Sequence, residues 1–426
     1  MSTHGTVPAA SRPRAFASFA NRDFRTFFLA SSAAMMADNI EHVISYYVIF
    51  QKFHSPALGA FAVVSHWVPY LLLAGYTGAL ADRFDVRRLI QTSMLLFIGV
   101  SVGWGIMFHN DSTEEWKAMV LLVIHGIAGV IWNPASQVLI HRIVGIDQLP
   151  SAVRLTATGR YLAFLLGPAI GSAILLAFFG PVYGIFINAL IYVPMAVWLI
   201  KAPYGSEPHT GRQRPQPLRG FGDILATMRV VASNPVLSSM TVMIGASAFF
   251  VGNAYQAQMP GFATDLGHGQ PGTAYSLLLG ADAAGGLAAG LILESRGLLL
   301  PNPRTAFVLA MIWCVALGIF AQSTSYTLAI PMLFLAGFVE LSFNSMAQSL
   351  VQLNAPGDIR GRVIGVFAMS ANGMRTFSGL SVGLLGAAIG IHWSLTASAA
   401  ALFLAYVVLV VRRRARAQLE LRPGSP

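Results

Sequence analysis

Apolar stretches long enough to cross a membrane alternate with short polar segments along the whole chain. A membrane-spanning helix needs about 20 mostly apolar residues. Twelve stretches have this length, at approximately residues 25–50, 57–80, 87–108, 117–140, 151–178, 181–200, 236–258, 273–294, 304–322, 327–350, 361–388 and 393–411. Membrane-spanning β-strands would instead give segments of about ten residues with alternating polarity. The pattern therefore predicts an all-α polytopic membrane protein with twelve transmembrane helices.

One long polar segment, rich in Pro, Gly and Arg, separates the sixth stretch from the seventh and is typical of a linker. The predicted organisation has five parts. They are an N-terminal segment (1–24), a six-helix half (25–200), a linker (201–235), a second six-helix half (236–411) and a basic tail (412–426).

The two halves carry matching residues at equivalent places. A shift of 211 residues aligns Asn133 with Asn344, Gln137 with Gln348 and Asp147 with Asp358, and a shift of 212 aligns Gly78 with Gly290 and Asp82 with Glu294. Two parallel six-helix repeats are a transporter architecture in which the substrate binds between the halves near the membrane midplane.

Positive charge is confined almost entirely to one side of the predicted bundle. Only Lys52 and Lys117 fall on the other side, and Arg160 and Arg375 fall inside apolar stretches. Short loops rich in Lys and Arg stay in the cytoplasm, so both termini are expected to be cytoplasmic, in a bacterial inner membrane. The net charge of +10 is explained by these loops and does not indicate nucleic acid.

The loop after the second stretch carries a recognisable motif. It reads Gly78-Ala-Leu-Ala-Asp82-Arg83-Phe-Asp85-Val-Arg87-Arg88. It resembles the signature loop of the major facilitator superfamily, with Asp85-Val86 where Gly-Arg is usual, a variant similar to the branch of siderophore exporters and macrolide efflux pumps. The resemblance implies a gate. Gly78 would allow close helix approach, Asp82 would face a helix N-terminus across the halves, and Arg83, Arg87 and Arg88 would remain in water.

The fifth stretch contains Gly159 and then Gly167-Pro168-Ala-Ile-Gly171. This resembles the antiporter motif of the same superfamily, which implies export, although Gly and Pro are also frequent in membrane helices generally. Asn133-Pro134-Ala135 with Gln137, and the segment 358–363, also resemble the siderophore and macrolide branch.

Ionisable side chains at membrane depth are costly and therefore indicate function. In the first stretch Asp38, Glu41 and His42 share one helical face. They predict a proton-carrying site; a fixed ion pair or a helix cap is the structural alternative. His66 and His125 are interpreted as buried hydrogen-bonding groups or, alternatively, as a proton relay.

Two arginines lie deep in apolar stretches and need anionic partners. Asp38 or Glu41 could pair with Arg160, and Glu340 or Asp282 could pair with Arg375. Alternatively, either guanidinium could hold an anionic group of the substrate.

Further polar residues lie in the second half. Glu340, Asn344 and Gln348 form one polar face, on which Asn344 and Gln348 are assigned to helix packing. Asp282 and Glu340 are further candidates for the proton-coupling site or the substrate cavity, although Asp282, among glycines, could instead be a buried structural partner. Asn253, Tyr255 and Gln256 could line a cavity or act as contacts between helices.

Nothing in the sequence indicates an enzyme, a cofactor or a metal site. It contains no Walker-type phosphate loop and no metal-binding spacing, and the single Cys314 permits no internal disulfide. The leading hypothesis is a monomeric, proton-coupled exporter of a small amphipathic compound in the lipid bilayer. The alternatives are a lysophospholipid transporter, which the Asp38-Asn39 pair also resembles, and a non-transporting sensor or scaffold.

Overall fold

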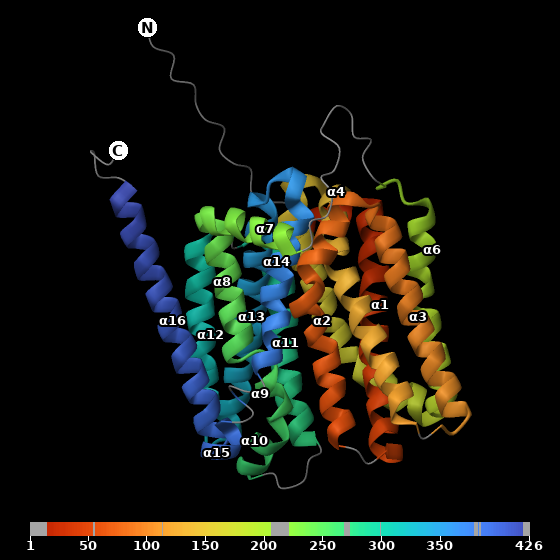
Figure 1. Ribbon diagram of the computed structural model, residues 1–426. Helices are drawn as coiled ribbons and strands as arrows, with labels where there is room; N and C mark the ends of the chain where they lie inside the picture. The colour runs from red at the N-terminus through yellow and green to blue at the C-terminus, as the bar shows by residue number, and fades with distance from the viewer. Residues whose placement is uncertain are drawn as a thin grey trace.

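The structure is a computed structural model that describes residues 15–53, 56–112, 114–205, 221–267, 273–298, 300–378, 382 and 385–420. Within these ranges the chain forms helices and no strand (Figure 1). The elements are η1 (Ala17–Ala20), α1 (Arg22–Phe53), α2 (Pro56–Arg83), α3 (Val86–His109), α4 (Glu115–Ala169), η2 (Ile170–Phe179), α5 (Gly180–Ile191), α6 (Val193–Lys201), α7 (Phe221–Ser233), α8 (Pro235–Phe250), α9 (Ala254–Ala257), α10 (Met259–Asp265), α11 (Thr273–Ser295), α12 (Pro303–Ala321), α13 (Tyr326–Asn354), η3 (Gly357–Ile359), α14 (Arg360–Ala371), η4 (Gly373–Phe377), α15 (Leu385–Ile389) and α16 (Ile391–Glu420).

Seven helical segments in the described part of the chain are long and apolar enough to cross a membrane. They are Val86–His109, Glu115–Lys201, Pro235–Gln256, Leu277–Ser295, Pro303–Ala321, Tyr326–Asn354 and Ile391–Arg412. The segment Glu115–Lys201 is 87 residues long and contains three of the predicted stretches. Helix α1 is as long as a membrane helix, but the polar group at residues 38–42 lowers its average hydropathy.

Three predicted boundaries differ in the structure. The fourth and fifth predicted stretches form one long helix, α4, which is kinked at Gly145 (φ 70°, ψ −175°). Past Pro168 this helix continues as the π-helix η2. The predicted stretch 361–388 is divided into α14, η4 and α15, and residues 379–381 and 383–384 lie outside the described part. The predicted linker contains helix α7. Linker residues 206–220 also lie outside the described part of the chain.

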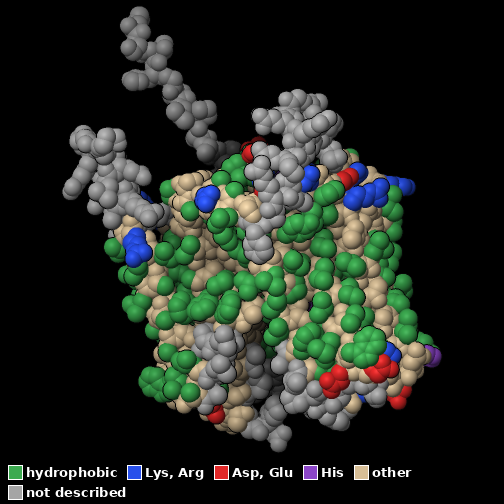
Figure 2. All heavy atoms as spheres, viewed as in Figure 1, with side chains coloured by type: hydrophobic (Ala, Val, Ile, Leu, Met, Phe, Trp, Pro, Cys, Tyr) green, Lys and Arg blue, Asp and Glu red, His purple; other side chains and the backbone are tan. Residues whose placement is uncertain are grey.

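The helices form two bundles side by side, α1–α6 on one side and α8–α16 on the other (Figure 1). Each bundle buries its own hydrophobic residues, in two clusters in the first bundle and one large cluster in the second. The cores of the first are built around Phe97 and Trp104, and that of the second around Trp313 and Tyr406. Helix α1 begins and α16 ends at the same end of the molecule, the upper end in Figure 1, which we call the termini end. On the face shown in Figure 2, Lys and Arg gather there.

Glycines allow the two halves to touch through backbone at the termini end. A Cβ added to Gly78 on α2 would clash with the carbonyl oxygen of Gly361 and lie 2.8 Å from Cα of Gly365, both on α14. Gly290 on α11 faces Thr158 of α4 in the same close way. Side chains longer than hydrogen would therefore separate α2 from α14 and α11 from α4.

Acidic residues fasten both of these contacts. Asp82 on α2 accepts hydrogen bonds from the backbone N–H groups of Gly361 (2.5 Å) and Arg362 (2.9 Å) at the start of α14. Glu294 on α11 accepts from Nε of Arg154 (2.9 Å) and from the Ser151 hydroxyl, both on α4. The structure therefore has its halves joined at the termini end.

We predict that Asp82→Asn opens the termini end and slows transport. Asparagine keeps one acceptor oxygen but loses the charge, and hydrogen bonds to a charged group contribute roughly 1.5–3 kcal/mol each. Spin labels on cysteines placed at the exposed Phe84 and Asp358, in a Cys314→Ala background, report the separation of the halves. Asp147→Asn, at an exposed position, is the control. Unchanged label distances and unchanged transport in Asp82→Asn would remove the gating role.

Candidate functional site

A polar cavity lies between the two halves. It consists of two adjoining chambers of about 160 and 410 Å³, which share much of their lining. The shared polar side chains are Asn133, Gln137, Arg160, Asn253, Gln348, Asn372 and Arg375. Asn344 also lines the smaller chamber. Asn344 and Gln348, which the sequence assigned to helix packing, thus also face the cavity.

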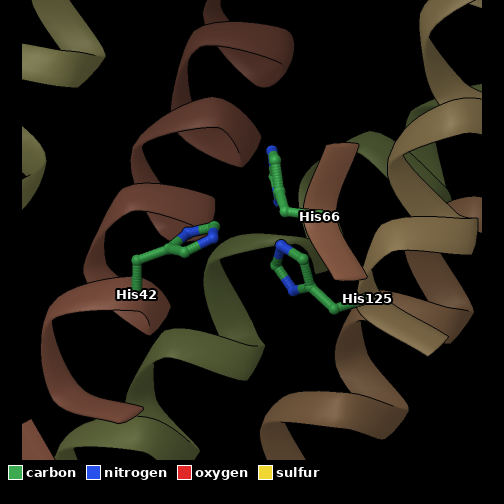
Figure 3. Close-up of side chains that lie close together, drawn as sticks. All are labelled: His42, His66 and His125. Atoms are coloured by element: carbon green, nitrogen blue, oxygen red, sulfur yellow. The ribbon is translucent and has the colours of Figure 1, made fainter. Parts of the chain in front are cut away.

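A cluster of carboxylates and imidazoles occupies the first half, beside the larger chamber. Asp38, Glu41 and His42 come from α1, His66 from α2 and His125 from α4. Figure 3 shows the three imidazole rings directed toward one another from these three helices. Asp38, His42 and His66 line the chamber, whereas Glu41 is only 2% exposed.

His125 lies between the two carboxylates. Its Nδ1 is 2.7 Å from Oε1 of Glu41, and its Nε2 is 2.8 Å from Oδ1 of Asp38. The second contact has ion-pair distance, although its alignment falls short of a regular hydrogen bond. Glu41 also accepts a hydrogen bond from Ser101. Because each ring nitrogen faces a carboxylate, the arrangement favours an imidazolium that compensates two buried negative charges.

The expected pairing of Asp38 or Glu41 with Arg160 was therefore wrong in the described structure, because both carboxylates contact His125 instead. Sequence reasoning missed this partner because His125 lies some 85 residues away on another helix. Its signal was only an ionisable residue in an apolar stretch, the same signal that singled out Asp38.

The imidazoles also meet one geometric condition for a metal site. Ligand nitrogens of His42, His66 and His125 lie within 4.8 Å of one another, a grouping that no sequence spacing indicates. An imidazole binds a metal through a free lone pair, however. His125 has none while Asp38 and Glu41 hold its two nitrogens. We therefore assign no metal to the cluster.

A second group of carboxylates lies in the other half. The Tyr255 hydroxyl bridges Asp282 (3.2 Å) and Glu340 (3.4 Å), and the Gln256 amide donates to Asp282 (3.1 Å). Asp282 is 3% exposed and its Oδ1 has no hydrogen-bond partner. Asp282 is therefore buried against Tyr255 and Gln256, and within the described residues it forms no ion pair with Arg375. Asn253 lines the cavity and donates to Gln256 (3.2 Å).

The glycine-proline motif packs α4 closely against α1. A Cβ added at Gly167 would lie 2.5 Å from Cβ of Asn39, and one at Gly171 would lie 3.3 Å from Cα of Ile40. Gly159, the residue directly before Arg160 of the cavity wall, faces Ser32 and Phe28 in the same way. The motif thus joins the helix that carries Arg160 to the helix that carries Asp38.

The signature loop is more ordered than its sequence indicates. Asp85 caps α3 and accepts hydrogen bonds from Nε and Nη2 of Arg87 at 3.1 and 2.7 Å. Partial burial would raise the pKa of Asp85, but the hydrogen bonds from Arg87 lower it below its usual value. Arg87 also donates to the carbonyl of Ala202 (2.5 Å). The Arg87 side chain is thus paired and only partly exposed, while the Arg88 side chain donates to Gln91.

Comparisons with known proteins agree with this architecture. The family described as "Transmembrane secretion effector" matches residues 13–423. The chain is similar to the multidrug efflux pump Tap of Mycobacterium tuberculosis, with 23% identity over 417 residues, 93% of this chain and 96% of that protein.

A more local match is to the putative multidrug resistance protein MdtD of Cronobacter sakazakii, with 28% identity over 117 residues. This is 28% of the chain, which spans about a quarter (24%) of that relative.

Two solved structures are similar in fold. The human organic anion transporter MFSD10 has a TM-score of 0.74 at 15% identity, covering 91% of this chain and 98% of that one. The major facilitator superfamily transporter FucP in its outward conformation has a TM-score of 0.72 at 14% identity, covering 92% and 98%. The chain belongs to the transmembrane secretion effector family of the major facilitator superfamily, whose members are membrane transporters and not enzymes.

Proposed function

We propose that this protein is a proton-coupled exporter of a small amphipathic compound that works by alternating access. The observation that carries the proposal is the buried contact of Asp38 and Glu41 with His125 beside the cavity. Ionisable groups at membrane depth that face an aqueous cavity are the usual components of proton pathways in transporters.

The cluster offers one partly exposed and one buried carboxylate. The Asp38 side chain is 15% exposed and lines the cavity, whereas Glu41 is held by Ser101 and His125 away from it. A proton that reaches Asp38 from the cavity would neutralise it and break its ion pair with His125. Because Asp38 is on α1 and His125 on α4, this would weaken the contact between the two helices and leave Glu41 as the remaining carboxylate on His125. Protonation would in this way favour one arrangement of the halves over the other.

Direction and location follow from charge and from the relatives. Tap and MdtD carry names of multidrug efflux and resistance proteins, which supports export of an amphipathic compound. The Lys- and Arg-rich termini end would be cytoplasmic by the positive-inside rule. The state with its halves joined there then opens to the outside, in the inner membrane of a bacterium, with the monomer as the transporting unit.

We predict that Asp38→Asn abolishes transport driven by a pH gradient. Asparagine has nearly the same shape but cannot take up a proton in the relevant range, so proton movement and substrate movement would separate. In proteoliposomes, substrate-evoked proton flux should fall to background, while exchange of substrate down its own gradient continues. The measurement is made at several pH values, with Asp265→Asn, a carboxylate that is 51% exposed, as the control.

The contrary result is equally clear. Full proton coupling in a protein with both Asp38→Asn and Glu41→Gln would exclude the cluster as the coupling site and leave Asp282 and Glu340 as the remaining candidates. A non-transporting sensor would show no exchange in any variant, the unaltered protein included.

We also predict the orientation in the membrane. In a Cys314→Ala background, a cysteine at the exposed Glu115 should react with a membrane-impermeant maleimide in intact cells. A cysteine at the exposed Ser233 of α7 should react only after the membrane is permeabilised, because it lies at the termini end. The reverse labelling pattern would contradict the proposed orientation, and export with it.

A further inference from the structure

Two arginines, one from each half, lie in the central cavity. Arg160 comes from α4 and Arg375 from η4, and both line both chambers. Among the described residues, neither forms an ion pair with a carboxylate. A guanidinium cannot be deprotonated in a protein, and an uncompensated charge at membrane depth is costly. The cavity therefore has a place for negative charge that the described protein fills only in part.

The Arg375 guanidinium is oriented for a ligand. Its Cζ lies 5.0 Å from the ring centroid of Trp67, a cation–π distance. Its Nε is buried without any hydrogen-bond acceptor in the described structure. Stacking on the indole fixes the plane of the guanidinium and leaves an N–H donor free at its edge. Such a fork is suited to the oxygens of a carboxylate, sulfonate or phosphate.

The carboxylates near the cavity are engaged with other groups. Asp38 contacts His125 at 2.8 Å, and Glu340 accepts a hydrogen bond from Tyr255 at 3.4 Å. Glu340 does face the same smaller chamber as the arginines and offsets part of their charge. Two guanidinium groups against this single carboxylate still leave positive charge in that chamber.

The remaining walls suit an amphipathic molecule. Trp67, Trp132 and Phe164 line the larger chamber, together with the amides of Asn133, Gln137 and Asn372. Its volume of about 410 Å³ is within the usual range for ligand pockets, roughly 300–1,000 Å³. An aromatic body with one acidic group matches both the walls and the arginines.

We propose that the site binds an amphipathic organic anion whose carboxylate, sulfonate or phosphate is held between Arg160 and Arg375. The claim that this anion is the exported compound rests on the function proposed above. The claim that the site binds such an anion does not. Because the arginines come from opposite halves, a bound anion connects the halves through the cavity. Anion binding and closure of the cavity are then coupled.

The test compares three probes with the same aromatic body. N-Dansylglycine is an anion, N-dansylglycinamide is neutral, and N-dansylethylenediamine is a cation. Their fluorescence on binding is measured with the purified full-length protein in phosphatidylcholine nanodiscs, without a pH gradient. We expect N-dansylglycine to bind best. Arg160→Gln and Arg375→Gln should each weaken its binding by about ten- to a hundredfold, the effect of losing hydrogen bonds to a charged group.

Matched variants separate recognition from folding. Arg160→Lys and Arg375→Lys keep the charge without the fork, and we expect intermediate affinity from them. Arg304→Gln, exposed at the start of α12, should leave binding unchanged. Glu340→Gln removes the opposing charge from the cavity and should tighten anion binding. Preferential binding of the cationic probe, weakened by Glu340→Gln, would overturn the proposal, and so would binding of the anion that is insensitive to both arginines.

A competitor identifies the source of the anion. Lysophosphatidylglycerol carries the same kind of charge on a lipid. If lysophosphatidylglycerol leaves N-dansylglycine bound, the site takes free organic anions as proposed. If it displaces N-dansylglycine in a way that depends on Arg375, the site takes a lipid headgroup instead, and the proposal of a free organic anion is overturned. Failure of proton coupling with intact anion binding would count against the proposed function alone.

Discussion

The cost of placing charge inside a membrane determines the arrangement of this molecule. A carboxylate or guanidinium away from water must be paired, hydrogen-bonded or exposed to an aqueous cavity. The ionisable groups on these helices follow this rule in three ways. Glu41 and Glu294 are paired in buried positions, by His125 and Arg154. Asp82 is held by backbone N–H groups at the start of a helix. Arg160 and Arg375 have neither solution and lie in the cavity instead.

The internal repeat gives the two halves equivalent places with different partners. Asp82 and Glu294 occupy matching positions, and each reaches across to the other half beside a glycine. Gly78 lies against the backbone of α14, and Gly290 lies against the side chain of Thr158. Asp82 accepts two backbone N–H groups at the positive end of α14 and forms an ion pair with Arg362 that is 3.5 Å long and partly exposed. Glu294 uses an arginine and a serine in a buried pair, which costs more to break. The contact of α2 with α14 is therefore the one that would open first, whereas the contact of α11 with α4 resembles a hinge.

Much of the fold could be predicted because its signals are local. The lengths of the apolar stretches predicted the membrane helices. The uneven placement of Lys and Arg predicted that both chain termini lie at one end, and the loop from Gly78 to Arg88 indicated the family. The site was predicted only in part. Spacing along one helix placed Asp38, Glu41 and His42 together, but their partner His125 lies on another helix, and sequence patterns carry no information on which helices face each other. Charge complementarity suggested Arg160 as that partner. Packing decided otherwise, because Gly159, Gly167 and Gly171 bring α4 so close to α1 that the Arg160 side chain is left on the cavity side.

Helix α1 connects the two chemical parts of the site. On one face its carboxylates hold His125, which precedes the kink of α4 at Gly145, and on another it packs against the glycines around Arg160, which follow that kink. The two parts of α4 thus meet the same helix at two places with different kinds of contact. The glycine contact is van der Waals packing and does not change with protonation, whereas the Asp38 contact depends on charge. Neutralising Asp38 therefore loosens α1 from the first part of α4 while α1 stays attached to the second. Any tilt of α1 that follows would displace Arg160 within the cavity, which gives a physical route from proton uptake to the group proposed to hold the substrate.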